Sequence, residues 1–160
     1  MKIAEFLRED LILPDLSATD KAGVLRELCI PLGRAHGLDP GRLTEVLLER
    51  EKLGSTGLGF GVAIPHGRIR TLKEPACAFV RTQAPIPFEA PDGQSVSLVF
   101  ALLVPEHATE AHLEILSELA QMFSDPDLRD QLAKVHDIQA AHRLITEWSP
   151  YAPAERSAAV

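Results

Sequence analysis

Apolar residues recur at helical spacing in two stretches of the N-terminal third of this chain. The first stretch follows Ser17, Thr19 and Asp20, which are all candidate helix caps, and ends before Gly37, which is typical of a helix end. Pro31 lies inside this helix and is expected to kink or split it, because proline lacks an amide hydrogen and clashes with the preceding turn. The apolar face of the helix consists of Val24, Leu25, Leu28 and Leu32.

The second helical stretch starts with Asp39 as its cap and Pro40 in its first turn. Its last turn carries Arg50, which is predicted to point toward a glycine-rich segment. An arginine at this place is as compatible with a solvated helix end as with a planar guanidinium that binds a phosphoryl group. The apolar face of this helix consists of Leu43, Val46 and Leu47.

Further helices are predicted near both ends of the chain. A short helix is expected at residues 2–8. In the C-terminal half, helices are expected to begin at Thr109, after the cap Asp125 and after the cap Asp137.

Strand patterns lie between the helices. Residues 96–104 form a nearly continuous apolar run, which is typical of a central strand covered on both faces. Residues 76–82 predict a second strand, which Pro85 and Pro87 are expected to end, and a brief strand is expected around residues 11–16. Helices and strands in this order predict a layered α/β fold.

Length and composition favour one compact domain, since the chain has 160 residues, 46% of them hydrophobic and 24% charged. After Trp148 the composition shifts to proline, alanine and serine, so we expect a domain at residues 1–148 and a flexible tail at 149–160. Cys29 and Cys77 lie far apart, which favours buried free thiols in a reducing cytoplasm over a disulfide framework or a zinc site.

The net charge of −7 argues against a nucleic-acid partner, because binding to a phosphate backbone needs clustered lysine and arginine. An acidic surface instead suits docking to a basic patch of another protein. The N-terminus has no signal-peptide pattern, and no apolar run is long enough to span a membrane. We therefore expect a cytoplasmic protein without membrane insertion, and the sequence predicts neither a cofactor nor a metal site.

The segment GSTGLGFGVAIPHG, residues 54–67, carries the candidate chemistry. Its histidine, His66, is expected at the end of a short buried strand, between Pro65, which fixes its own φ, and Gly67, which lets the backbone approach a group on the ring. A single loop histidine is more often an ordinary polar surface residue. The combination of a glycine-rich loop, an apolar run and flanking Pro and Gly favours presentation of the imidazole to a phosphoryl group.

The same segment closely resembles the active-site signature of the IIA proteins of the bacterial phosphoenolpyruvate:sugar phosphotransferase system, fructose/mannitol type. It looks most like the stand-alone nitrogen-regulatory IIA proteins. The resemblance covers residues 1–148 and includes three further segments: Leu48–Lys52, Val99–Pro105 and Thr109–Leu113. It implies a single domain in which a mixed central sheet is flanked by helices on both faces.

The resemblance also implies roles for three residues. His66 would be the nucleophile and phosphoryl acceptor, His112 would hydrogen-bond the phosphoryl oxygens, and Arg50 would offset their charge. Transfer between imidazoles needs mainly alignment and charge stabilisation, and a neutral ring is available near neutral pH. The helix N-terminus disfavours a protonated His112, which predicts a neutral ring there as well. Weaker candidates for phosphate binding are Ser55, Thr56, Gly57, Gly59, Gly61 and Gly67.

The implied donor is an HPr-like phosphocarrier protein. The implied downstream partners are a IIB domain or regulated transporter and kinase proteins. Because the sequence contains no attached IIB or membrane IIC region, we expect a nitrogen or metabolic regulator. The alternative is a fructose- or mannitol-specific IIA component that passes its phosphoryl group to a IIB domain.

Two other classes of protein are less compatible with the sequence. A nucleotide-binding enzyme would place its glycine loop after a strand and before a helix, whereas here the glycines follow a helix and precede a strand. The glycines also lack the GxGxxG and GxxxxGK spacings. A binding module that is never phosphorylated remains a second alternative, against which the joint presence of Arg50, His66 and His112 argues.

Overall fold

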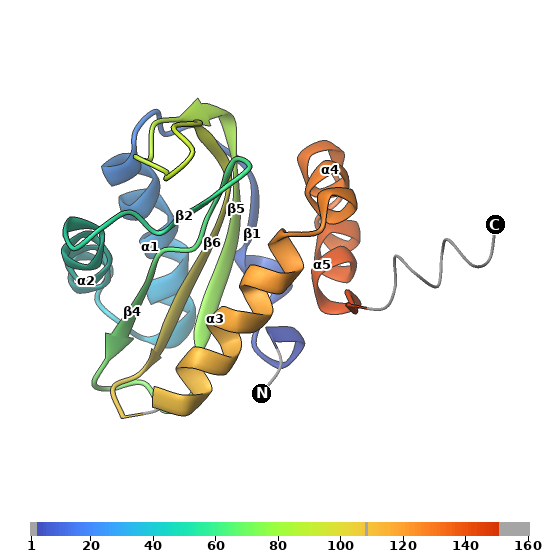
Figure 1. Cartoon of the computed structure of the whole chain (residues 1–160). Coiled ribbons are helices and arrows are strands. Elements are labelled where there is room, and N and C mark those ends of the chain that lie inside the picture. The colour runs from blue at the N-terminus through green and yellow to red at the C-terminus, as the bar shows by residue number, and fades with distance from the viewer. Residues whose placement is uncertain (1–2, 108, 151–160) are drawn as a thin grey trace.

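The computed structural model describes residues 3–107 and 109–150, which form one sheet between two groups of helices (Figure 1). The strands are β1 (Ile12–Leu16), β2 (Gly57–Gly59), β3 (Val62–Ala63), β4 (His66–Ile69), β5 (Ala76–Ile86) and β6 (Val96–Pro105). They are ordered β1-β5-β6-β3-β2, and β4 also pairs with β6. Parallel pairs (β1 with β5, β3 and β4 with β6) occur beside antiparallel ones (β5 with β6, β2 with β3). The predicted mixed sheet is confirmed.

Helices cover both faces of the sheet, as expected (Figure 1). One face carries α1 (Lys21–His36) and α2 (Pro40–Lys52), and the other carries α3 (Thr109–Phe123), α4 (Pro126–Lys134) and α5 (Ile138–Thr146). The central strand β6 serves both apolar clusters, because successive side chains of a strand point to opposite faces. Leu98, Phe100 and Leu102 pack toward α3 and α4, while Val99, Ala101 and Leu103 pack toward α1 and α2.

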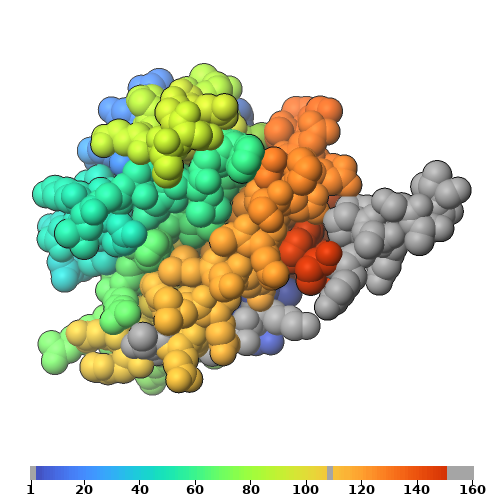
Figure 2. Space-filling view, viewed as in Figure 1, coloured from blue at the N-terminus to red at the C-terminus, as the bar shows by residue number. Residues whose placement is uncertain are grey.

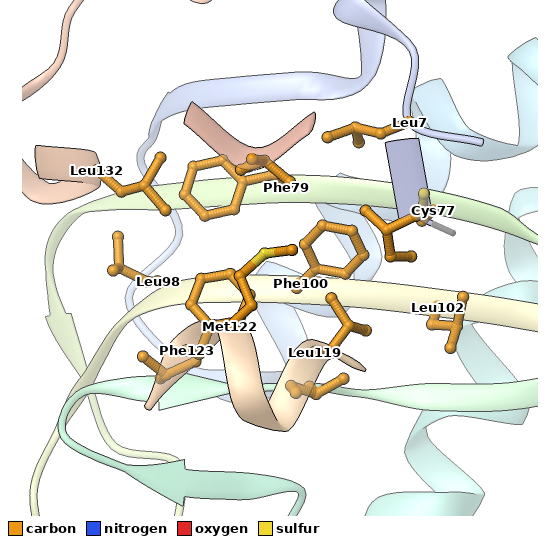
Figure 3. Close-up of a cluster of buried hydrophobic side chains, with 14 of the residues drawn as sticks. Leu7, Cys77, Phe79, Leu98, Phe100, Leu102, Leu119, Met122, Phe123 and Leu132 are labelled. Carbon is orange, nitrogen blue, oxygen red and sulfur yellow. The ribbon is translucent and has the colours of Figure 1, made fainter. Parts of the chain in front are cut away.

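The cluster under α3 is rich in aromatic rings (Figure 3). Phe123 of α3 stacks on Phe79 of β5 with ring centroids 6.5 Å apart and lies tilted against Phe100 of β6 at 6.1 Å. These contacts fix α3 against the centre of the sheet. Because α3 also carries His112 near its other end, they help to set where that histidine lies.

The helix caps are where the sequence predicts them. The carboxylates of Asp20, Asp39, Asp125 and Asp137 each accept a hydrogen bond from a backbone amide in the first turn of the helix that follows. Gly37 ends α1 in the left-handed conformation.

Of the kink or split predicted at Pro31, the split does not occur, since α1 continues from Lys21 to His36. An interior proline costs a helix about 3 kcal/mol. Around it, Leu28, Cys29 and Leu32 are fully buried, and each large apolar side chain contributes about 1.5–3 kcal/mol. Burial of this face therefore outweighs the hydrogen bond that Pro31 cannot donate.

Two other predicted boundaries are wrong. The helix expected at residues 2–8 is a 3-10 turn at Ile3–Glu5, followed by a second turn at Glu9–Leu11; residue 2 lies outside the described residues. Strand β5 runs through Pro85 instead of ending before it. The pairing register with β6 shifts between Arg81 and Ile86, so the proline lies at an irregularity where no ladder hydrogen bond is required of it.

The glycine-rich segment is a hairpin and not a loop. Strands β2 and β3 pair antiparallel, and the turn between them has three consecutive residues with positive φ: Gly59 (94°), Phe60 (58°) and Gly61 (79°). Glycine adopts such angles without strain, which explains the two glycines on either side of Phe60. His66 does not end the apolar strand but begins the next one, β4.

Both cysteines are free and buried, as predicted. Burial raises the pKa of the Cys29 thiol to about 11 and that of the Cys77 thiol to about 12. Of the predicted tail, residues 151–160 lie outside the described residues. Within residues 3–107 and 109–150, no helix combines the length and the hydropathy needed to cross a bilayer.

Candidate active site

The candidate site lies where α2, β4 and the start of α3 meet. Gly67 of β4 allows this meeting, because a Cβ at that position would lie 2.5 Å from Cγ1 of Val46 on α2. The missing side chain lets α2 pack directly against β4, and this packing brings the last turn of α2, with Arg50, to the same pocket as His66.

His66 is held by a backbone contact. Its Nδ1 lies 2.8 Å from the carbonyl oxygen of Ile64, two residues earlier in the chain. A carbonyl oxygen can only accept, so Nδ1 carries the proton in this contact. In the neutral ring, Nε2 is then the nitrogen with the free electron pair.

His112 faces His66 across the pocket. The two ring centroids are 5.4 Å apart, and the rings meet edge to face at 62°. His112 lies in the first turn of α3 and is 7% exposed, whereas His66 is half-buried. The Nδ1 atom of His112 is enclosed and has no hydrogen-bond partner among the described residues.

The pocket around the two rings is lined by α2, the residue after it, β4 and α3. Arg50 donates one hydrogen bond, from Nη1 to the carbonyl of Gly54 at 2.8 Å, as its predicted direction toward the glycine-rich segment requires. The surface of β4 is visible between α2 and the start of α3 in Figure 2. The lining residues are Val46, Glu49, Arg50, Leu53, His66, Gly67, Arg68 and His112.

The surroundings of both rings favour the neutral imidazole. Burial is the largest cause that lowers the pKa of His66, and the Arg50 charge lowers it further, while the Ile64 carbonyl and the Glu51 charge oppose this. The pKa of His112 is also lowered, first by burial and then by His66 and Arg68. This direction agrees with the neutral His112 expected from its place at a helix N-terminus.

The weaker candidates lie elsewhere, with one exception. Gly67 lines the pocket, whereas Ser55, Thr56, Gly57, Gly59 and Gly61 do not. The Ser55 hydroxyl donates to the carbonyl of Phe88 at 2.6 Å, and the Thr56 hydroxyl donates to the carboxylate of Glu51. Within residues 3–107 and 109–150, no group of three or more His, Cys, Asp and Glu side chains is placed to hold a metal ion.

Comparison with known protein families places the chain in one family. The family described as "Phosphoenolpyruvate-dependent sugar phosphotransferase system, EIIA 2" matches residues 5–148. The chain belongs to this family. The match includes every residue of the pocket and confirms the resemblance seen in the sequence.

Individual EIIA relatives cover almost the whole chain. A nitrogen regulatory protein of Bradyrhizobium diazoefficiens is 40% identical over 145 residues, which are 91% of this chain and 95% of the relative. The fructose-specific EIIABC component of Bacillus subtilis is 34% identical over 92% of this chain but only 23% of its own length. The crystal structure of the nitrogen regulatory protein IIA-Ntr from Neisseria meningitidis superposes with a TM-score of 0.86 at 45% identity, covering 89% of this chain and 98% of that one.

Sequence reasoning about this EIIA domain missed two contributors near the site. One is the Ile64 carbonyl, which no side-chain pattern reveals. The other is Glu51, a buried carboxylate beside Arg50. A signal for it exists, because Leu43, Leu47 and Glu51 are spaced four residues apart and so share the buried face of α2.

Proposed function

We propose that this EIIA domain carries a phosphoryl group on Nε2 of His66, received from an HPr-like phosphocarrier protein in the cytoplasm. The observation that carries the proposal is the contact between Nδ1 of His66 and the Ile64 carbonyl. That contact leaves Nε2 as the nucleophilic nitrogen of a neutral ring whose pKa is already lowered by burial.

In the transfer step, the electron pair on Nε2 attacks the phosphorus of the donor's phosphohistidine. A new N–P bond forms on His66 as the N–P bond of the donor breaks, and that electron pair returns to the donor imidazole. The proton of His66 stays on Nδ1 throughout, hydrogen-bonded to the Ile64 carbonyl. Catalysis then rests on alignment and on charge stabilisation, as in other phosphoryl transfers.

Arg50 and His112 are proposed to stabilise the transferred group. Arg50 has N–H donors beyond the one that binds Gly54, and its planar guanidinium suits phosphoryl oxygens. His112 has its Nδ1 enclosed, so its Nε2 is the nitrogen left to face the pocket and donate to a phosphoryl oxygen. Among the weaker candidates only Gly67 keeps a place in the proposal, as a lining residue.

The proposed docking face for the phosphocarrier surrounds this pocket. Leu53 on the pocket rim is 84% exposed, and Leu113, next to His112, is 61% exposed. Exposed leucines beside a reactive group are suited to a transient protein interface. Phosphorylation would add nearly two negative charges between them, which gives downstream partners a means to distinguish the two states.

The test is incubation with phosphoenolpyruvate, enzyme I and the phosphocarrier, followed by intact mass measurement. We expect one acid-labile phosphoryl adduct on the wild type and none on His66→Ala. His136→Ala is the matched control, because His136 is an exposed histidine away from the pocket and should leave the adduct in place. An unmodified wild type, in a mixture that phosphorylates an established IIA protein, would contradict the proposal.

We further propose that the phosphorylated domain acts as a nitrogen or metabolic regulator, which the relatives named nitrogen regulatory protein support. A sugar-specific role is the alternative, supported by the relative named a fructose-specific EIIABC component. Mixing the phosphorylated domain with an isolated fructose-type IIB domain separates the two. Rapid and complete transfer to the IIB domain would favour the sugar-specific role, whereas retention on His66 favours the regulator.

A further inference from the structure

Glu51 is a buried carboxylate at the end of α2, with its side chain only 3% exposed. A buried charge is costly unless it is paired and hydrogen-bonded. It lies one residue after Arg50 but does not line the pocket. The buried carboxylate therefore needs hydrogen-bonding and ionic partners, and one of these partners is connected to His66.

The first partner of Glu51 is Lys21, at the start of α1. Lys21 Nζ lies 3.0 Å from Oε2 of Glu51 and 4.7 Å from the centre of the Phe88 ring. The ammonium group is thus placed between a carboxylate and an aromatic face, both of which attract it. This ion pair ties the start of α1 to the end of α2.

The second partner is Thr56, just before β2. The Thr56 amide donates to both carboxylate oxygens of Glu51, at 3.3 Å and 3.2 Å, and the Thr56 hydroxyl donates to Oε1. Three donor contacts from one residue fix Thr56 firmly on the carboxylate. Thr56 is itself buried, so water does not compete for these contacts.

From Thr56 the contacts continue to the imidazole. The Thr56 carbonyl accepts a hydrogen bond from the Ile64 amide at 3.0 Å, and the Ile64 carbonyl in turn faces Nδ1 of His66 at 2.8 Å. A continuous series of hydrogen bonds therefore joins the Glu51 carboxylate to the His66 ring through two residues.

We propose that Glu51 is a positioning residue for His66, because its carboxylate fixes Thr56, Thr56 fixes Ile64, and the Ile64 carbonyl holds the Nδ1 proton so that Nε2 stays free. The inference rests on the proposed function for its consequence in phosphoryl transfer. The tautomer of unphosphorylated His66 can be measured without any phosphoryl transfer.

The charge of Glu51 also affects the pKa of His66. Both the Glu51 charge and the Ile64 hydrogen bond raise the pKa of His66 against burial and Arg50. Loss of the carboxylate removes the effect of the Glu51 charge and weakens the hydrogen bond between Ile64 and His66. Both changes act in the same direction, so a Glu51 variant should lower the His66 pKa below that of the wild type.

The experiment compares Glu51→Gln with Glu45→Gln on the unphosphorylated protein. Glu45 is the matched control because it lies on the same helix and pairs with Arg42 at an exposed position. Nitrogen chemical shifts of the imidazoles, followed by NMR through a pH titration, report the tautomer and the pKa of His66. We expect the Nδ1–H form in the wild type and in Glu45→Gln, and a mixture of both tautomers with a lower pKa in Glu51→Gln.

Thr56 variants extend the test in case Glu51→Gln does not fold. Thr56→Val keeps the backbone groups but removes the hydroxyl, whereas Thr56→Ser keeps the hydroxyl. We expect a partial tautomer shift in Thr56→Val and none in Thr56→Ser. If folded Glu51→Gln and Thr56→Val both retain the wild-type tautomer and pKa, Glu51 only supports the fold and the proposal is wrong.

The rate of phosphorylation completes the comparison. We expect Glu51→Gln to slow phosphorylation by roughly ten- to hundredfold, the effect of a misaligned reacting group, while Glu45→Gln stays at the wild-type rate. A wild type that shows the Nδ1–H tautomer but accepts no phosphoryl group would refute the proposed function and leave the positioning proposal standing. A tautomer shift without any change in rate would refute the consequence drawn here for transfer.

Discussion

The two histidines of the pocket are held in different ways. His66 lies on a strand, and its Nδ1 is hydrogen-bonded to the Ile64 carbonyl. The buried Glu51 is joined to this contact through the hydrogen bonds of Thr56. His112 stands in the first turn of a helix, and its enclosed Nδ1 has no partner among the described residues. A nucleophile needs a defined tautomer and direction, whereas a hydrogen-bond donor can adjust to the group it binds. The difference supports the unequal roles proposed for the two neighbouring rings.

The largest expected difference is between the phosphorylation of His66→Ala and that of His112→Ala. His66→Ala should accept no phosphoryl group at all. His112→Ala should still reach the full adduct but more slowly, by roughly 10²–10³-fold, which is typical of losing one donor to a developing negative charge. Time-resolved intact mass measurement distinguishes the two, and a complete loss in His112→Ala with retained fold would contradict the division of roles.

Arg50→Lys tests the charged side chain that shares the pocket with the two neutral rings. Lysine keeps the positive charge but loses the planar set of donors. We expect a roughly tenfold slower phosphorylation, corresponding to the loss of one hydrogen bond to a charged group. Arg42→Lys on the same helix, at an exposed position, is the control and should have the wild-type rate.

Gly67→Ala tests the packing that brings α2 to His66. The added methyl group meets Val46, so we expect the free energy of unfolding to fall by about 1–3 kcal/mol. Gly41→Ala on α2 has no neighbour closer than 3.7 Å and should be neutral or slightly stabilising. Denaturant unfolding measures both, and the double variant Gly67→Ala/Val46→Ala should regain part of the loss. Equal stability of Gly67→Ala and the wild type would show that the close approach is unimportant.

The smallest expected effect is a pH dependence of stability. An unfolded chain has histidine pKa values of about 6.5, and both His66 and His112 have lower values when folded. Below about pH 6.5 the unfolded state therefore binds more protons, so the free energy of unfolding decreases as the pH falls toward the folded pKa values. Unfolding measured between about pH 7.5 and about pH 5.5 should show this decrease, and His112→Ala should reduce it. A stability that rises on acidification over this range would contradict the neutral rings.

Much of the fold follows from local patterns. The apolar run of β6 predicts a strand covered on both faces, and polar capping residues predict the starts of α1, α2, α4 and α5. The failures have a common cause in contacts distant along the chain. Pro31 is tolerated because the face around it is buried against the sheet, and the end of β5 is set by its register with β6.

Site residues that belong to a sequence motif could be predicted. Contacts between residues far apart in the chain could not. His66, His112 and Arg50 come from separate segments, and the structure brings all three to one pocket. The hydroxyls of Ser55 and Thr56 are weaker candidates for phosphate binding in the sequence. Ser55 instead binds Phe88, 33 residues away, and Thr56 binds a carboxylate whose burial is visible only once α2 is packed.

We propose that the backbone contact at Nδ1 makes Nε2 of His66 the accepting nitrogen. NMR of the phosphorylated protein labelled with ¹⁵N tests this directly, because coupling between ³¹P and ¹⁵N identifies the nitrogen bonded to phosphorus. We expect coupling to Nε2 of His66, with Nδ1 still protonated. Coupling to Nδ1 of His66, or to either nitrogen of His112, would contradict it.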